Sequence, residues 1–177
     1  MATSTLPNRL RINGLIDTNQ NVVSNMEKIA RNATTWLSYD TANGKWAVVI
    51  NKAGTSVKAF DDSNIVGPIS VTGKDVTELY NKARVSYPLR DSADKTDTVV
   101  LEIPVGERSS YEKERILDIT YDMVNEPVQA QLLGLIELKQ SRVNTIVEFT
   151  ADYSTINVAA GDIIDLTNTH LGYASKL

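Results

Sequence analysis

Apolar residues alternate with polar ones in many short stretches of the chain and predict β-strands. The alternating runs are short and end at Gly, Pro, Asn or Asp, as half-buried strands usually do. They cover residues 8–17, 34–40, 45–52, 56–60, 67–73, 81–88, 98–104, 115–124, 144–153 and 161–167. The pattern predicts a β-rich chain of the α+β class, and it contains no internal repeat.

Two segments depart from this alternation and carry apolar residues at helical spacing. In the first, residues 18–33, either Thr18 or Asn19 is placed to cap an amphipathic helix. Its apolar positions are Val22, Met26, Ile29 and Ala33. A helix is therefore expected directly after the first strand.

The second helical segment, residues 126–142, has the clearest start signal in the chain. Asn125 is a suitable N-cap, and Pro127 suits the first turn. The predicted apolar stripe consists of Val128, Leu132, Leu135 and Ile136, widened by Leu133 and Leu138. Gly134 costs the helix roughly 1 kcal/mol relative to alanine, so a glycine there indicates close packing against a neighbour.

The segment Thr41–Gly44 joins two alternating runs and predicts a tight hairpin. Asn43 and Gly44 supply the positive φ angles that such a turn requires. Trp36 and Trp46 flank the turn, and we expect them to face each other across the two strands. Paired in this way, tryptophans indicate a core or an interface more often than a platform for a sugar.

Two further segments are expected to lie between strands. Residues 75–80 predict one helical turn with Asp75 near its positive end, and residues 89–97 predict a polar loop. The aspartates that recur in this loop at every third position are Asp91, Asp94 and Asp97. A calcium-binding hand needs glycine at its sixth position, where this chain has Thr96, so a solvated hairpin loop is the better interpretation.

The composition excludes several classes of protein. With 177 residues, 42% hydrophobic and 23% charged, the chain has the composition of a globular protein. A formal charge of −4 without any run of Lys and Arg argues against a nucleic-acid binder, and the absence of cysteine excludes disulfides and thiolate metal sites. No apolar run approaches the ~20 residues of a membrane span, and the first residues do not resemble a signal peptide. We expect a chain that is intracellular or assembled inside a cell.

Each residue that could carry chemistry has a simpler explanation. His170, the only histidine, is expected on the surface near the C-terminus. Asp162 follows a turn glycine, and Asp165 is expected on the solvent side of a strand. The other adjacent carboxylates are Asp61 and Asp62. Asn32 begins an Asn-Ala-Thr glycosylation sequon at a helix end. We therefore predict no catalytic residue, no metal site and no cofactor.

Three stretches of the chain occur in an order that is more specific than any one of them. The first is "NRLRINGLIDTNQNVVSNMEKIARNATTWLSYDTANGKWAVVINKAG", the second is "DVTELYNKARVSYP", and the third is "EPVQAQLLGLIELKQSRVNTIVEFTADYSTINVAAGDIIDLTN". In this order they resemble the tail-tip attachment and hub proteins of long-tailed bacteriophages. The resemblance covers roughly residues 8–176.

The resemblance implies a structural part of a tail tip or baseplate hub. In such proteins, barrel domains form a trimeric ring that joins the tail tube to the distal tip and supports host attachment and DNA delivery. The implied fold combines tail-hub β-barrel elements with two amphipathic helices and a β-hairpin subdomain. The implied partners are further copies in a homotrimer, the tail tube and other tail-tip or baseplate proteins, with no specific nucleic-acid binding and no membrane span. The implied location is the virion, after assembly in the bacterial host cytoplasm.

The chain also departs from the family pattern. Ala160 stands where the family often has proline before the Gly-Asp turn, and large flanking regions of the hub are missing. We therefore expect part of a longer chain. Its expected divisions are a helix plus hairpin subdomain at 8–66 and a barrel-like hub domain at 67–177 that includes the helix 126–142.

Two other functions stay open on the sequence alone. The chain could be a host-surface binding module of a tail, for a glycan or a protein, that uses Trp36 and Trp46. It could also be a tail-associated cell-wall hydrolase, for which Asp162 and Asp165 are the carboxylate candidates. The structural role is preferred, and the expectation is that the protein is not an enzyme.

Overall fold

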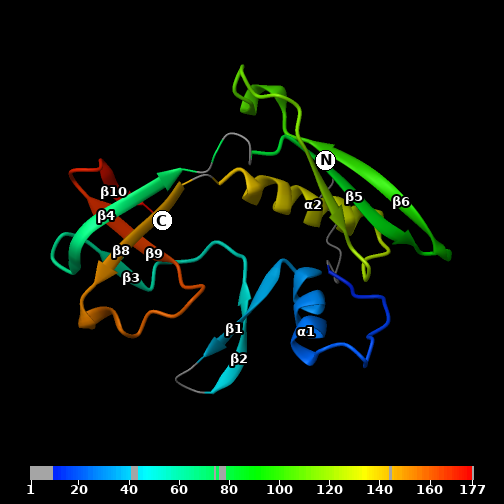
Figure 1. Cartoon of the computed structure of the whole chain (residues 1–177), viewed down its shortest axis with the longest axis horizontal. Coiled ribbons are helices and arrows are strands. Elements are labelled where there is room, and N and C mark those ends of the chain that lie inside the picture. Colours follow the sequence, from blue (N-terminus) through cyan, green and yellow to red (C-terminus); the bar gives the residue numbers. More distant parts are fainter. Residues whose placement is uncertain (1–9, 41–43, 74, 76–78, 144, 177) are drawn as a thin grey trace. The chain divides into compact units, whose positions relative to one another are not determined.

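The computed structural model describes residues 10–40, 44–73, 75, 79–143 and 145–176, and these form a mixed α+β fold that is rich in strands (Figure 1). The helices are α1 (Val22–Arg31), α2 (Pro127–Ser141) and the short 3-10 helices η2 (Val105–Glu107) and η3 (Tyr153–Thr155). The strands are β1 (Thr35–Asp40), β2 (Lys45–Ile50), β3 (Lys58–Phe60), β4 (Ile65–Gly73), β5 (Lys82–Leu89), β6 (Ser92–Glu102), β7 (Ile116–Thr120), β8 (Thr145–Ala151), β9 (Ile164–Asn168) and β10 (Tyr173–Lys176). The predicted class is confirmed.

The described strands form four small sheets, with the orders β1–β2, β10–β9–β3, β4–β8 and β6–β5–β7. Their contacts divide the chain into two compact units. Unit 1 consists of residues 1–36 and 74–144, and unit 2 consists of residues 37–73 and 145–177, within the described parts of those ranges. Closure of the strands into a barrel stays a prediction. The division into a helix plus hairpin subdomain at 8–66 and a hub domain at 67–177 also stays a prediction.

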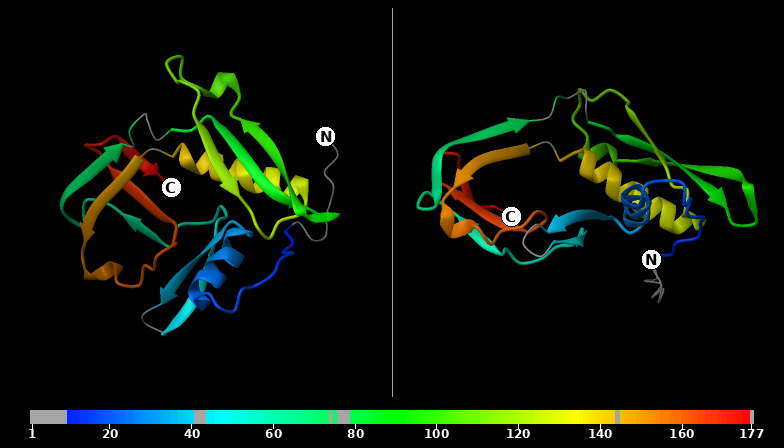
Figure 2. Two further views of the ribbon diagram at one scale, coloured as in Figure 1. Left: turned by 45° about the vertical axis from the view of Figure 1, so that its right-hand side comes forward. Right: turned by 60° about the horizontal axis from the view of Figure 1, so that its bottom comes forward.

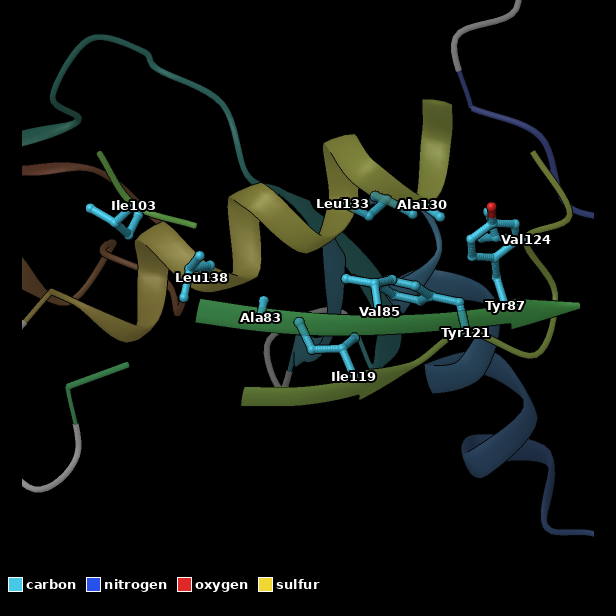
Figure 3. Packing of buried hydrophobic residues seen from close by; sticks show 10 residues of the cluster. All are labelled: Ala83, Val85, Tyr87, Ile103, Ile119, Tyr121, Val124, Ala130, Leu133 and Leu138. Atoms are coloured by element: carbon cyan, nitrogen blue, oxygen red, sulfur yellow. The ribbon is translucent and has the colours of Figure 1, made fainter. Parts of the chain in front are cut away.

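The core of unit 1 lies between α2 and the sheet β6–β5–β7. Strand β5 is central, antiparallel to β6 and parallel to β7, and α2 runs along the sheet (Figures 1 and 2). Alternate residues of β5, namely Ala83, Val85 and Tyr87, are buried toward the helix (Figure 3). The rest of the buried cluster consists of Ile103, Ile119, Tyr121, Val124, Ala130, Leu133 and Leu138. The buried residues of the strands and of α2 therefore form a single apolar layer.

Helix α2 confirms the second predicted helix, but it buries a different face from the predicted one. It begins at Pro127, and the N-cap position is Glu126 rather than Asn125. Its buried positions are Gln129, Ala130, Leu133, Gly134 and Leu138. Val128, the first residue of the predicted stripe, is 60% exposed, and the other three stripe residues are half-buried. The predicted stripe was therefore wrong as the main contact face, whereas Leu133 and Leu138, which were predicted to widen it, are fully buried.

Gly134 explains which face of α2 packs on the sheet. Val85 of β5 and Leu101 of β6 lie so close to this glycine that a Cβ atom would overlap the Val85 side chain. The helix therefore rests on the sheet through a face that includes Gly134 and Ala130, two small residues one turn apart. The prediction that Gly134 marks close packing is confirmed.

The predicted strand 8–17 is wrong in its described part, residues 10–17, which is irregular. Gln129 of α2 pairs with this segment through its side-chain amide. The Arg11 N–H donates to Gln129 Oε1 at 3.0 Å, and Gln129 Nε2 donates to the Arg11 carbonyl at 3.0 Å. The Asn13 N–H also donates to the Met123 carbonyl at 2.9 Å. A buried amide thus takes the place of a neighbouring strand.

Helix α1 confirms the first predicted helix, although it begins later than expected. The N-cap is Asn21 and not Thr18 or Asn19, because the Asn21 side chain accepts a hydrogen bond from the Val23 N–H at 3.0 Å. This bond satisfies one of the free backbone donors of the first turn. Ala30 is the buried residue of the helix.

The predicted polar loop 89–97 is wrong for most of its length. Strand β5 ends at Leu89 and β6 begins at Ser92, so the turn itself consists of Arg90 and Asp91. Along this stretch β6 pairs with β5 at the edge of the sheet, where polar side chains remain in water. Half of the predicted helical turn at 75–80, residues 76–78, lies outside the described part of the chain, and the described residues Asp75, Leu79 and Tyr80 are not helical.

Arg142, directly after α2, binds the segment between β6 and β7 through hydrogen bonds. Its Nη1 and Nη2 atoms donate to the two carboxylate oxygens of Glu112, each at 2.9 Å. The same nitrogens donate to the carbonyls of Tyr80 and Glu107, each at 3.2 Å. The Ser109 N–H adds a 3.2 Å bond to the carboxylate. Because the Glu112 side chain is only 5% exposed, this pair is shielded from water.

We expect this pair to weaken in acid. The hydrogen bonds from Arg142 and from the Ser109 N–H lower the pKa of Glu112 to about 2. Since the pKa is lowered in the folded state, the carboxylate stabilises the fold above its ordinary pKa of ~4.3, and that stabilisation is lost as the pH falls toward about 2. Thermal unfolding of the native protein and of Glu112→Gln between pH 7 and pH 2 should show the smaller acid-induced loss in the variant. Parallel pH curves would contradict the assignment.

The described strands of unit 2 form three sheets, of which β1–β2 begins in the last residues of unit 1. Strands β4 and β8 are antiparallel, and β9 lies between β3, which is parallel to it, and β10, which is antiparallel. Phe60 of β3 and Phe149 of β8 meet edge to face with ring centroids 5.1 Å apart. Phe60 and Leu166 of β9 are the most buried apolar side chains of the described part of this unit. These contacts connect the sheet β10–β9–β3 with the pair β4–β8.

The predicted hairpin is confirmed as the two-stranded sheet β1–β2. Gly44 has a φ of +63°, the left-handed conformation that the turn requires. The other predicted turn residues, 41–43, lie outside the described part of the chain. The expectation that Trp36 and Trp46 face each other was wrong. Trp46 instead meets Tyr39 edge to face at 5.3 Å, and strand alternation places Tyr39 and Trp36 on opposite sides of β1.

Candidate functional site

The structure separates most of the residues that the sequence offers for chemistry. His170 lies in the exposed turn between β9 and β10, as expected, beside an open hollow of about 360 Å³ that Asp62 and Asn168 also line. Asn168 Nδ2 donates to Asp62 Oδ1 at 2.7 Å. Asp62 is therefore hydrogen-bonded to an asparagine and not to His170. The arrangement is typical of a structural contact between two turns and not of an acid–base pair.

The remaining carboxylate candidates have local backbone roles. Asp61 accepts a hydrogen bond from the Ser63 N–H at 2.9 Å, and the hydroxyl of Ser63 lowers its pKa. Asp162 accepts from the Ala159 N–H at 2.8 Å, which closes the turn before β9. Asp165 is half-buried in β9, which differs from the solvent-side position that was expected. The prediction that none of these residues is catalytic stays a prediction.

The predicted aspartate series and the sequon also fall on structural positions. Asp97 lies on β6 and accepts a hydrogen bond from the Tyr87 hydroxyl at 3.0 Å, which together with burial raises the pKa of the tyrosine. Asn32 is only 4% exposed, and its Nδ2 donates to the Lys28 carbonyl at 2.6 Å. The acceptor amide of the sequon therefore terminates α1. Within the described residues, no three side chains of the types that bind metals gather as a metal site would need.

One face of the β1–β2 hairpin is apolar and open to solvent. The edge-to-face contact of Tyr39 and Trp46 defines this face, and alternation along β2 adds Val48 and Ile50 to it. We call these four residues the outer hairpin face. Their exposed fractions lie between 47% for Trp46 and 58% for Ile50. Val49 points the other way, and it lies so close to Gly161 that a Cβ atom there would overlap it.

A second candidate site lies in unit 1, where α1 and α2 meet. Arg31 at the end of α1 forms a two-pronged pair with Glu137 of α2, with Nε–Oε1 and Nη2–Oε2 distances of 3.2 Å. The Tyr121 hydroxyl donates to Glu137 Oε1 at 2.7 Å, and the Arg31 guanidinium lies 5.6 Å from the centre of the tyrosine ring. Burial and the bond to Glu137 raise the pKa of Tyr121, and the bond to Glu137 raises the pKa of Arg31.

An open hollow of about 420 Å³ adjoins this pair, and we call it the Trp36 hollow. Trp36 and Thr34 line it beside Arg31 and Glu137. Leu117 of β7 and Gln140 of α2 also line the hollow, together with Thr35 and Ser141. Thr34 has a φ of +53°, an unusual conformation for a β-branched residue, and Trp36 is 46% exposed. The hollow therefore combines an aromatic surface with planar polar groups.

Sequence reasoning missed this arrangement because its members are far apart in the chain. Arg31 and Glu137 are separated by 106 positions, and neither belongs to a recognisable motif. Trp36 was noticed, but it was assigned a partner on the hairpin. The sequence predicts no membrane span. Within the described residues, neither α-helix has the length and apolar character needed to cross a bilayer.

Comparison with known protein families gives a match over most of the chain. The sequence model of the family described as "Putative phage tail protein" matches residues 37–176, which is more than half of the chain. Comparison with curated protein sequences gave no match.

Solved structures share the fold at low sequence identity. The tail protein from Neisseria meningitidis MC58 has a TM-score of 0.64 and 13% identity, and the match covers 89% of this chain and 48% of that one. A chain of the virion of a native gene transfer agent particle has a TM-score of 0.67 and 14% identity, covering 85% and 34%. The 43 kDa tail protein of prophage MuSo2 from Shewanella oneidensis has a TM-score of 0.56 and 13% identity, covering 90% and 46%. The chain thus spans between a third and a half of the length of these proteins.

Proposed function

Because the chain belongs to the phage tail protein family, we propose that it is a structural part of a bacteriophage tail tip or baseplate hub. In this role it contributes to a ring that joins the tail tube to the distal tip and supports host attachment and DNA delivery. The role is not enzymatic. It places the protein in the virion, after assembly in the cytoplasm of the bacterial host, and gives it other tail-tip, baseplate and tail-tube proteins as partners.

The outer hairpin face is the observation that carries this proposal. A two-stranded hairpin is marginally stable in water by itself, and this one leaves Tyr39, Trp46, Val48 and Ile50 about half exposed. Clustered exposed apolar side chains mark sites of contact with other molecules in soluble proteins. A subunit of an assembly can cover such a face when it enters the assembly.

A second copy of this chain is the occupant that fits the outer hairpin face. The four residues of the face carry no charge, so a neighbouring chain of net charge −4 can cover it without placing like charges together. Most soluble homo-oligomers are closed and symmetric, and a ring forms when this face of one copy contacts a different surface of the next copy. We propose a homotrimer, in agreement with the threefold hub that the sequence resemblance implies.

Val48→Lys should convert the assembled protein into monomers. Burying a lysine in an apolar contact is strongly unfavourable, whereas on the exposed face of the monomer it is tolerated. Light scattering coupled to size-exclusion chromatography should show a trimeric mass for the native chain and a monomeric mass for the variant. Val66→Lys is the matched control, because Val66 of β4 has the same 57% exposure as Val48 and lies outside the hairpin.

Two outcomes contradict this proposal. One is a native chain that stays monomeric over a wide range of protein concentration. The other is an oligomer whose mass responds equally to Val48→Lys and Val66→Lys, since a general effect of added charge would then explain the result.

A further inference from the structure

We propose that the Trp36 hollow of unit 1 binds a neutral sugar ring of a bacterial glycan. The inference rests on the charge balance, the aromatic surface and the hydrogen-bonding groups of the hollow. It does not require an oligomer, because a single chain supplies all the lining residues and all of them belong to unit 1. A structural tail subunit can carry such a site in addition to its role in assembly.

The charge balance favours a neutral ligand. The guanidinium of Arg31 and the carboxylate of Glu137 form a two-pronged pair, so the positive and negative charges offset each other within the hollow. A phosphate or carboxylate ligand would have to compete with Glu137 for Arg31, and a cationic ligand would have to compete with Arg31 for Glu137. Neither competition arises for a ligand without charge.

The pair still offers hydrogen bonds to such a ligand. Arg31 has five N–H donors, of which two are directed to Glu137, and its side chain is 54% exposed. Glu137 keeps further acceptor capacity and is 26% exposed. The exposed side chain of Gln140 adds one carbonyl acceptor and two N–H donors at the rim. Planar groups with parallel donors or acceptors match two neighbouring hydroxyls of a sugar ring.

The aromatic surface gives the ligand a preferred shape. Trp36 is 46% exposed at the hollow, and half-buried Leu117 adds an apolar patch. A pyranose ring has one face of C–H groups that can pack on an indole while its hydroxyls point to the polar rim. The volume of about 420 Å³ lies within the roughly 300–1,000 Å³ of ordinary small-ligand sites.

Local hydrogen bonds hold the backbone just before Trp36. Thr34, two residues earlier, has a φ of +53°, a conformation that costs a β-branched residue on the order of 1–3 kcal/mol. The Thr34 N–H donates to the Arg31 carbonyl at 3.3 Å, and the Thr35 hydroxyl donates to the Ala30 carbonyl at 2.9 Å. These bonds fix the exit of the chain from α1 and therefore the position of Trp36 relative to Arg31.

Saturation-transfer NMR on the full chain tests the proposal with three soluble probes. The trisaccharide of N-acetylglucosamine represents the glycan of the cell wall, maltotriose represents neutral surface polysaccharides, and adenosine is a flat ring without a pyranose. We expect saturable binding of one of the trisaccharides, and the preferred one identifies the source of the glycan. Trp36→Ala should raise its Kd about tenfold.

Trp46→Ala is the matched control for loss of an aromatic side chain. Trp46 has nearly the same exposure, 47%, but its neighbours on the outer hairpin face are apolar. Its removal should leave the Kd unchanged. If Trp36→Ala does not fold, Gln140→Leu replaces it, since this exposed helix position can be changed without disturbing the core, and it should also weaken binding.

Three results would overturn the proposal. The first is no saturable binding of either trisaccharide. The second is equal loss of binding in Trp36→Ala and Trp46→Ala, and the third is adenosine binding as tightly as the sugars. None of these results bears on the oligomer test with Val48→Lys, so the two proposals fail separately.

Discussion

Replacing Arg142 with methionine should lower the free energy of unfolding of the protein by about 3 kcal/mol. Methionine keeps much of the apolar stem but removes the guanidinium, so the Glu112 carboxylate loses both of its 2.9 Å hydrogen bonds. Glu112 is only 5% exposed, and removing one partner of a shielded ion pair costs about 3–5 kcal/mol. The lower end applies because Arg142 is 18% exposed and the Ser109 N–H still binds the carboxylate.

The loss has a second cause in the backbone. Arg142 also binds the carbonyls of Tyr80 and Glu107, so it joins three segments that enter or leave the sheet of unit 1. Arg142→Lys should therefore recover only part of the stability, because an ammonium group cannot reproduce the planar fork. Urea unfolding followed by circular dichroism measures each variant.

Arg84→Met is the matched control for loss of a surface ion pair. Arg84 and Asp118 are 3.3 Å apart, but their side chains are 49% and 70% exposed. Such pairs contribute roughly 0–1 kcal/mol, so this variant should remain close to the native protein. In the double variant Arg142→Met/Glu112→Gln the uncompensated charge is absent, and part of the loss should be recovered. A loss as small as that of Arg84→Met would show that the Glu112 pair is not shielded.

The features that the sequence predicted correctly are those set by neighbouring residues. The β1–β2 hairpin follows from a glycine with positive φ between two alternating runs. Helices α1 and α2 follow from apolar spacing with a capping residue or a proline at the start. Gly134 indicated close packing because glycine has no other benefit inside a helix.

The errors arise where a distant residue decides the structure. The segment 10–17 alternates like a strand, but its partner is the Gln129 side chain, more than a hundred positions away. The predicted stripe of α2 was centred on large apolar residues, whereas the buried face of the helix combines Leu133 and Leu138 with the small residues Ala130 and Gly134. Hydrophobicity alone does not record how closely two backbones can approach.

The candidate site was beyond sequence reasoning for the same reason. Arg31, Tyr121 and Glu137 come from α1, the segment after β7, and α2, and only the packing of unit 1 brings them together. The residues that motifs singled out, such as Asn32 and Asp162, have side-chain bonds that close helix ends and turns. The polar residues that the motifs singled out therefore have structural roles, and the candidate site was found only through long-range contacts.

Gly134→Ala should lower the free energy of unfolding by about 2 kcal/mol, although alanine is the better helix former. The gain in helix propensity is about 1 kcal/mol. This gain is outweighed by a steric clash, because the new Cβ would overlap the side chain of Val85 and lie 3.0 Å from Leu101 Cδ1. Both residues belong to strands of a close-packed sheet, so the helix must move outward or the valine must leave its rotamer, at a cost of up to about 3 kcal/mol.

Gly106→Ala separates the clash from the general effect of replacing glycine. A Cβ at Gly106 in η2 would meet no atom within 4 Å, and its backbone does not have positive φ. This variant should be unchanged or more stable by up to about 1 kcal/mol, because alanine restricts the unfolded chain. The two substitutions are chemically identical, but only Gly134→Ala should destabilise the protein.

The double variant Gly134→Ala/Val85→Ala assigns the loss to a single contact. Val85→Ala alone removes the methyl group that the new Cβ would meet, and it leaves a cavity that should cost about 2 kcal/mol. In the double variant, the methyl group introduced by Gly134→Ala occupies part of that cavity, so the combined loss should be smaller than the sum of the separate losses by more than about 1 kcal/mol. If the losses simply add, or if Gly134→Ala stabilises the protein, then α2 and β5 do not approach each other as closely as the structure has them.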